Sequence, residues 1–207
     1  MVTLYITRHG ETEWNCEERM QGWLDSNLTE KGENNARLLG QRLENTNFAA
    51  IFSSPSGRTK ATANLIRGDR EIPIYYDDQL KEMNMGMWEG KELSAIKEMY
   101  PVSYESFWNS PHLYKPIEGE TFEETRQRAS QIVDHIKKHY KSGNILIVTH
   151  SIIIKCLLTI FKNATIENLW TPPYIHDTSL SIVEINNSGY QIILEGDISH
   201  TEDNVSD

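Results

Sequence analysis

Short apolar runs alternate with longer amphipathic stretches along most of this 207-residue chain. Runs rich in β-branched and aromatic residues predict strands at 2–7, 49–53, 72–76 and 145–149, and a hairpin pair at 179–185 and 190–195. The run at 145–149 (ILIVT) is nearly continuously apolar, which is typical of a parallel strand covered on both faces. Pro73 favours an edge position for the third strand, because proline cannot donate to a neighbouring strand.

Helices are predicted between these strands from apolar positions at helical spacing. Their predicted spans are 30–45 after the N-cap Thr29, 55–68 ending near Gly68, a long helix from the capping box of Thr121 and Glu124 to Lys141 and Gly143, and 152–161. The last of these is apolar nearly all round and should be buried. The alternation predicts an α/β fold with a mostly parallel central sheet flanked by helices on both faces.

Residues 77–120 interrupt this alternation with turn residues, short helical candidates and many aromatic side chains. We interpret them as a cap insertion within a single domain that spans residues 1–207. The acidic tail 201–207 is expected to be loose.

Thirty acidic and twenty basic residues give a formal net charge of -10. This balance argues against nucleic acid or an anionic membrane as the main partner, because both attract clustered Lys and Arg. Cys16 and Cys156 are far apart and fit no metal or redox spacing, so we expect a reducing, cytoplasmic location. No signal peptide is expected from the first ten residues, and the longest apolar stretch is too short to span a bilayer.

Polar groups follow each predicted parallel strand. They are Arg8 and His9 after the first strand, Ser53, Ser54 and Arg58 after the second, Glu82 after the third and His150 after the fourth. The carboxyl ends of parallel strands meet at one edge of a sheet, so these side chains should converge there. Neutral imidazole is a nucleophile toward phosphorus, guanidinium groups hold phosphate oxygens, and a carboxyl of raised pKa serves as a general acid.

Arg58 falls in the first turn of its predicted helix, where a cation opposes the helix dipole by about 0.3–1 kcal/mol. A bound anion would reverse that cost. Guanidinium charge nearby would also lower the pKa of His9 and keep its ring neutral. Taken singly, Arg58 is explained equally well as a solvated arginine, and a lone histidine at a strand end is more often structural.

Several segments together resemble one family. They are YITRHGETEWN (5–15), QGWLDSNLTEKG (21–32), SSPSGRTKATA (53–63), EMNMGMWEG (82–90) and IVTHS (147–151). They resemble, in the expected order, the histidine phosphatase superfamily of phosphoglycerate mutase-like proteins. The compact length and the closing segments 169–174 and 195–200 are similar to its cofactor-independent, broad-specificity phosphatase branch.

The resemblance implies that His9 attacks phosphorus and becomes a phosphohistidine, while Arg8, Arg58 and His150 hold the phosphoryl oxygens. Glu82 would protonate the leaving alcohol and then activate water. The remaining substrate-binding positions that it implies are Asn15, Gln21, Gly22 and Ser151. Ser151 stands where the family usually has glycine, so its side chain is expected to narrow the pocket. The resemblance implies no metal and no cofactor, and small phosphate monoesters as substrates.

The substrate remains open between several alternatives. Residues 71–125 contain no arginine, whereas mutases of the family use basic residues in the insertion to bind a carboxylate. The cap aromatics should therefore favour apolar or aromatic esters, although about half of them should be cap core; they are Tyr100, Tyr104, Phe107, Trp108 and Tyr114. A 2,3-bisphosphoglycerate-dependent mutase, a narrower enzyme such as an alpha-ribazole phosphatase, and an inactive phosphate-binding module are the alternatives.

His135 and His139 could form a metal pair on one helix face, but no third ligand is evident.

Overall fold

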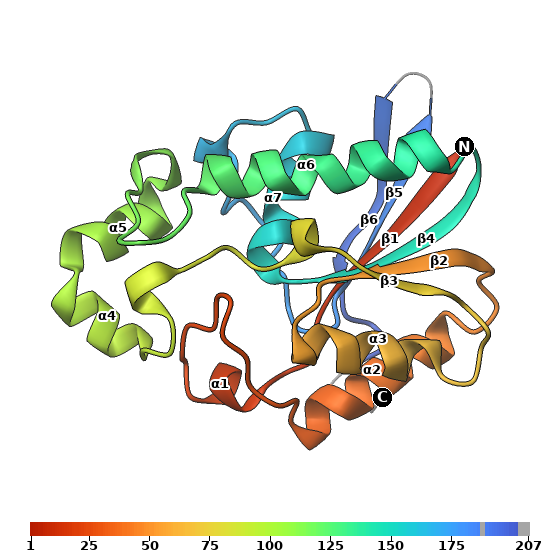
Figure 1. Cartoon of the computed structure of the whole chain (residues 1–207), viewed down its shortest axis with the longest axis horizontal. Coiled ribbons are helices and arrows are strands. Elements are labelled where there is room, and N and C mark those ends of the chain that lie inside the picture. Colours follow the sequence, from red (N-terminus) through yellow and green to blue (C-terminus); the bar gives the residue numbers. More distant parts are fainter. Residues whose placement is uncertain (187–188, 203–207) are drawn as a thin grey trace.

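A six-stranded sheet runs through the middle of the molecule (Figure 1). The computed structural model describes residues 1–186 and 189–202. The strands are β1 (Val2–Arg8), β2 (Phe48–Ser53), β3 (Ile74–Tyr76), β4 (Gly143–Thr149), β5 (Leu180–Asn186) and β6 (Gly189–Asp197). Their order is β3-β2-β4-β1-β5-β6; the first four are parallel, and β5 is antiparallel to both β1 and β6.

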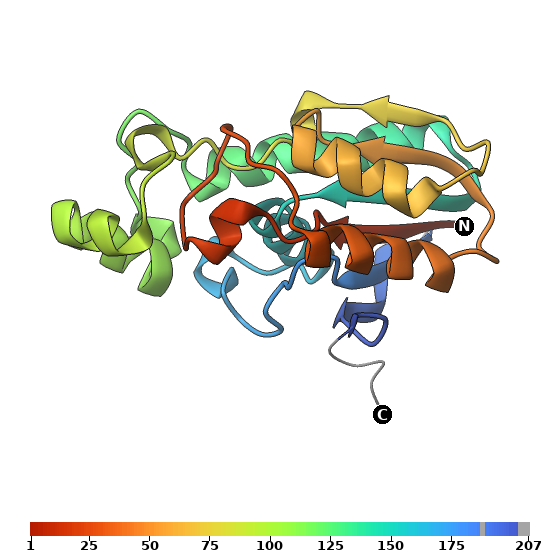
Figure 2. The ribbon, with the colours of Figure 1, turned by 90° about the horizontal axis from the view of Figure 1, so that it is seen from below.

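Helices cover both faces of this sheet (Figures 1 and 2). The pair α2 (Glu30–Arg42) and α3 (Gly57–Arg67) lies on one face, and the pair α6 (Phe122–His139) and α7 (Ser151–Phe161) lies on the other. Along β4, Ile145 and Ile147 belong to the core shared with α6 and α7, whereas Leu146 and Val148 belong to the core shared with α2 and α3. Burial on both faces explains why this strand has so few polar positions, and the predicted fold class is confirmed.

Local sequence signals set the helix starts more sharply than the helix ends. The Thr29 hydroxyl accepts from the Gly32 N–H, and Thr121 and Glu124 form the expected capping box. Both helices end a few residues before the predicted positions. β3 is an edge strand, as Pro73 indicated, and begins at the residue after that proline.

Residues 77–120, interpreted above as a cap, begin with a turn against α6 and then extend beyond one end of the sheet (Figures 1 and 2). Its elements are the 3-10 turns η1 (Asp78–Leu80), η2 (Gly86–Trp88) and η3 (Pro111–Leu113) and the helices α4 (Leu93–Met99) and α5 (Pro101–Asn109). Phe107 is fully buried at its centre, with ring centroids 4.9 Å from Phe122 and 5.6 Å from Trp170. Aromatic packing therefore joins the cap to α6 and to the segment that follows η4 (Ile166–Asn168).

The expected loose tail is wrong at its first two residues. Thr201 is buried, and the backbone N–H of Glu202 donates to the side chain of Asn35 in α2 at 3.1 Å. Residues 203–207 lie outside the described residues. Among the described helices, none combines the length and apolar character needed to cross a membrane.

Candidate active site

The register between β1 and β4 places two histidines side by side. Arg8 lies opposite Thr149, and the His9 N–H donates to the Thr149 carbonyl at 2.9 Å. His9 and His150 therefore leave the two strands at the same level, and their ring centroids are 5.3 Å apart. The convergence expected at the carboxyl ends of the parallel strands is present.

A backbone contact determines which ring nitrogen of His9 carries the free lone pair. Its Nδ1 lies 2.7 Å from the Gly10 carbonyl oxygen. A carbonyl only accepts hydrogen bonds, so Nδ1 carries the proton and Nε2 of the neutral ring carries the lone pair. Burial, followed by the charges of Arg58 and Arg8, holds the pKa of His9 well below its usual value. The ring is thus neutral near pH 7.

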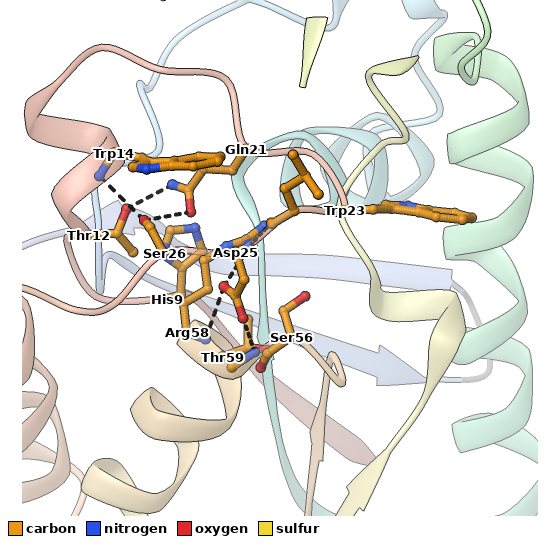
Figure 3. A network of polar contacts seen from close by, with 12 residues as sticks. His9, Thr12, Trp14, Gln21, Trp23, Asp25, Ser26, Ser56, Arg58 and Thr59 are labelled. Atoms are coloured by element: carbon orange, nitrogen blue, oxygen red, sulfur yellow. Dashed lines mark hydrogen bonds and ion pairs between the residues drawn. The ribbon is translucent and has the colours of Figure 1, made fainter. Parts of the chain in front are cut away.

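Arg58, in the first turn of α3, is oriented by the loop of residues 22–25 (Figure 3). Its Nη1 donates to the Leu24 carbonyl at 2.7 Å and to Asp25 Oδ1 at 2.9 Å. Its Nη2 donates to the Gly22 carbonyl at 2.9 Å. With 2% of its surface exposed, the side chain is fixed from several directions before any ligand arrives.

The carboxylate of Asp25 offsets the positive charge of Arg58, which the helix dipole disfavours at the start of α3. Besides its ion pair with the guanidinium, its carboxylate accepts from the backbone N–H of Gly57 at the start of α3. A bound anion was expected to supply that compensation, and an internal carboxylate supplies it instead. Arg8 differs, because no carboxylate of the described residues forms an ion pair with it; its Nη1 donates to the Ile175 carbonyl at 3.0 Å. Net positive charge therefore remains beside His9.

His150 is completely buried and has both ring nitrogens engaged. Nδ1 lies 3.1 Å from Arg58 Nη2, which can only donate, so Nδ1 is the acceptor. Nε2 then carries the proton and donates to the Ser54 hydroxyl at 2.9 Å. Burial, with the charge of Arg58 next, holds its pKa well below the usual value. His150 thus meets the cluster through Arg58 and Ser54.

Glu82 has the environment of a general acid. It is 7% exposed, and burial raises its pKa despite hydrogen bonds and arginine charge that act in the opposite direction. Its Oε1 accepts from the Met83 N–H at 2.9 Å. Its Oε2 lies 3.4 Å from both the Ser151 hydroxyl and the Ile152 N–H at the start of α7. The Ser151 side chain therefore contacts the proposed acid as well as lining the pocket.

The neighbouring loop residues use many of their polar atoms on one another (Figure 3). Gln21 donates to the Thr12 hydroxyl at 2.8 Å and accepts from Ser26 at 3.3 Å. Asn15 Oδ1 accepts from both the backbone and the hydroxyl of Thr12, so its Nδ2 is the atom able to meet a ligand. Gly22 has φ +54°, and a Cβ there would lie 2.3 Å from Glu89 Oε1, so a larger residue would be strained.

A cavity of about 610 Å³ joins these groups. The predicted site residues that line it are Arg8, His9, Asn15, Gln21, Gly22, Arg58, Glu82 and Ser151. His150 lies behind His9, covered by the groups named above. The opposite wall is largely apolar and includes Phe107 and Trp108 of the cap and Trp170 and Tyr174 of the body.

Two residues at this site were not predicted from the sequence. Asp25 lay inside a recognised segment, but only tertiary structure shows that it faces Arg58. Lys155 was counted as part of an apolar helix; its ammonium instead reaches the carbonyls of Thr171 and Pro173, both at 2.6 Å, beside the cavity. Its position four residues after Ser151, on the same helix face, was the available signal.

The described residues contain no group of three or more His, Cys, Asp or Glu side chains arranged to hold a metal ion. The rings of His135 and His139 lie 4.2 Å apart, but Nδ1 of His139 is bonded to the His135 carbonyl.

Comparison with known proteins identifies the family. The model of the histidine phosphatase superfamily (branch 1) matches residues 4–198. The solved structure of Bacillus stearothermophilus YhfR is 47% identical, covers 98% of this chain and 100% of its own, and has a TM-score of 0.94. Phosphoserine phosphatase 1 of Hydrogenobacter thermophilus is 29% identical over 83% of this chain and 81% of its own. Probable phosphoglycerate mutase GpmB of Escherichia coli O1:K1 / APEC is 31% identical over 98% and 96%.

The matched range covers nearly the whole chain and includes the buried imidazole and the guanidinium groups described above. The chain therefore belongs to the histidine phosphatase superfamily and is a phosphatase with a histidine nucleophile.

Proposed function

We propose that the protein is a metal-independent phosphomonoester hydrolase in which His9 is the nucleophile and Glu82 the general acid and base. One observation carries most of this proposal: the Gly10 carbonyl fixes the His9 tautomer, so that the lone pair of Nε2 is free in a cavity lined by Arg8, Arg58 and Glu82.

The first half-reaction transfers the phosphoryl group to the enzyme. His9 Nε2 forms a bond to phosphorus while the bond from phosphorus to the ester oxygen breaks. Arg8 and Arg58 stabilise the charge on the phosphoryl oxygens, and His150 supports the Arg58 guanidinium through the contact of its Nδ1 with Arg58 Nη2. Glu82 enters this step protonated, which its raised pKa favours, and gives its proton to the leaving alcohol.

The second half-reaction releases phosphate. Glu82, now a carboxylate, takes a proton from a water molecule as the water oxygen attacks phosphorus. The bond between phosphorus and Nε2 breaks, and neutral His9 and inorganic phosphate are restored. No group in either step requires a metal ion, since the arginines supply the positive charge.

The apolar wall supports a preference for esters with apolar or aromatic leaving groups. Trp108 and Trp170 pack with ring centroids 5.0 Å apart, and both line the cavity. An aromatic leaving group gains from apolar burial and ring packing there. Broad specificity follows from this wall, because apolar contact discriminates weakly between similar groups.

A phosphoglycerate mutase is the second candidate, favoured by the relative named above. A mutase has to hold a carboxylate and return its phosphoryl group before water attacks. Lys155 and Arg19 line the cavity from outside the cap. Both are already bonded, Lys155 to backbone carbonyls and Arg19 to Glu17 and the Gly90 carbonyl. We therefore place the hydrolase first.

Hydrolysis of p-nitrophenyl phosphate tests the two candidates. We expect rapid release of phosphate that chelators do not change, and no interconversion of phosphoglycerates. Strong interconversion with slow phosphate release would replace the hydrolase by the mutase. A panel of small acid, sugar, nucleotide and aromatic esters then defines the preference and checks for a narrow substrate, including an alpha-ribazole ester.

His9→Ala tests the nucleophile. We expect turnover to fall by several orders of magnitude while phosphate affinity is largely kept. His200→Ala is the matched control, because His200 is also a buried histidine of lowered pKa but does not line the cavity. An acid-labile phosphoenzyme should be trapped with the wild type and not with His9→Ala. Unchanged turnover in His9→Ala would remove the assignment and leave a phosphate-binding module as an option.

A further inference from the structure

Arg128 of α6 donates hydrogen bonds to the backbone around Glu82. Its Nη1 donates to the carbonyls of Gln79 at 3.0 Å and Lys81 at 2.8 Å. Its Nη2 donates to the carbonyl of Glu82 itself at 3.2 Å. With a longer contact to the Asp78 carbonyl at 3.5 Å, one guanidinium thus bonds four carbonyls between η1 and Glu82.

Glu120 pairs with Arg128 and bonds the backbone that follows Glu82. It forms a two-point ion pair with Arg128, with Nε to Oε1 at 2.9 Å and Nη2 to Oε2 at 2.7 Å. The same Oε2 accepts from the backbone N–H of Asn84 at 2.8 Å. The pair therefore contacts the chain before Glu82, at Glu82 and after it. The side chains of Arg128 and Glu120 are only 16% and 20% exposed, so water competes weakly with these bonds.

Glu82 depends on this backbone support because no helix or strand holds it. It lies between η1 and η2, and the closest contact of its carboxyl is to the N–H of the adjacent residue, Met83. Its contacts to α7 are 3.4 Å long. The Glu82 carbonyl also accepts from the Trp23 indole N–H at 2.8 Å, and the Leu80 carbonyl accepts from the Thr149 hydroxyl at 2.7 Å. The direction of the carboxyl is thus set mainly by where the backbone of residues 79–84 is held, and the Arg128–Glu120 pair is the part of this support that bonds the backbone on both sides of Glu82.

The ion pair also supplies this support without a net charge. A lone guanidinium next to Glu82 would favour its carboxylate and work against the proton that a general acid has to carry. Glu120 compensates that charge, and burial keeps the pKa of Glu82 raised.

We propose that Arg128 and Glu120 are positioning residues for Glu82, holding the general acid at the distance from which it protonates the leaving group. This inference rests on the proposed role of Glu82. It assigns to α6, which supplies none of the reacting groups, a part in proton transfer.

The dependence on the leaving group tests the proposal. A nitrophenolate leaves readily without a proton, whereas an alkoxide requires one, so loss of the general acid affects an alkyl phosphate far more than p-nitrophenyl phosphate. We use kcat/KM, which reports phosphoryl transfer to His9 and not the later hydrolysis. For Arg128→Met we expect about a 10- to 100-fold loss with propyl phosphate and less than about 3-fold with p-nitrophenyl phosphate. Arg126→Met, on the same helix with a weak ion pair to Glu123, should change neither ester.

Glu82→Gln separates failure of the inference from failure of the proposed function. If Glu82→Gln lowers kcat/KM equally for both esters, the general-acid role itself is wrong. If Glu82→Gln lowers kcat/KM mainly for propyl phosphate but Arg128→Met lowers it equally for both esters, Arg128 is merely structural and the inference is overturned. The double variant should be no more selective than Glu82→Gln alone. If Arg128→Met does not fold, Glu120→Gln replaces it, because glutamine keeps the shape of the side chain and one acceptor oxygen. The same selective loss of kcat/KM for propyl phosphate is then expected, but smaller.

Discussion

The two ends of the cavity are built by different means. At the phosphate end, Arg8, His9 and Arg58 come from a strand end, the following loop and a helix start, and hydrogen bonds fix most of them. At the cap end, Phe107, Trp108 and Trp170 are held mainly by ring packing. The first arrangement allows little adjustment, because hydrogen bonds fail within a few tenths of an ångström. The second tolerates different ligand shapes, since apolar contact is not directional. We therefore expect the phosphate end to determine the chemistry and the cap end to determine the selectivity.

Removing a group from the phosphate end should produce the largest effect. For Arg58→Gln we expect kcat to fall by about 100- to 1000-fold, as for other donors to a developing anionic charge. The loss should be equal for alkyl and aryl phosphates, because both carry the same phosphoryl group. Steady-state kinetics on the two esters measures it. A loss confined to one ester class would contradict the division between the two ends.

Acid should weaken the phosphate end through its buried histidines. The pKa of His9 is lowered in the folded protein, so below about pH 6.5 the unfolded chain binds a proton that the folded chain does not. The free energy of unfolding therefore falls as pH falls, by up to about 1.4 kcal/mol per pH unit for this residue, until the folded pKa is reached. Urea unfolding of wild type and His9→Ala between pH 7 and 5 should show a smaller slope in the variant. Equal slopes would show that His9 is not buried in its neutral form.

Changing the cap end should alter preference and leave the chemistry intact. For Trp108→Leu we expect kcat/KM for p-nitrophenyl phosphate to fall by about 3- to 20-fold through loss of ring packing, with propyl phosphate little changed. Tyr174→Ala is a second test with less risk to folding, because that side chain is 67% exposed while lining the cavity. An equal loss for both esters would mean that the wall supports the catalytic groups instead of selecting substrates.

The smallest effect is expected at Ser151, which lines the cavity and contacts the Glu82 carboxyl. A hydroxyl that donates to a carboxyl favours its ionised form, and the 3.4 Å distance makes this contribution small. Ser151→Gly should therefore raise the pKa of Glu82 slightly. The alkaline limb of kcat/KM for propyl phosphate should move upward by less than about one pH unit, because protonated Glu82 persists to higher pH. A downward shift would exclude the proposed contact.

The sequence could predict the reacting groups because strand register carries them. Once 2–7 and 145–149 are parallel neighbours, His9 and His150 follow their strands at equal positions. The roles of Asp25 and Arg128 could not be found this way, since each acts on a residue at least 33 positions away through a loop or a helix face. The anion at the start of α3 shows the same limit: the need for a negative charge was readable, but its source was not.

Local sequence thus determined the alternation of elements, the capped helix starts, the two-sided burial of β4 and the identity of the groups that can perform phosphoryl transfer. Tertiary structure alone decided how those groups are oriented: the tautomer of His9, the internal partner of Arg58, the hidden place of His150 and the support beneath Glu82. The physical reason is range. Propensity and capping act over a few neighbouring residues, whereas orientation within a buried site depends on hydrogen-bond partners that folding brings together from distant segments.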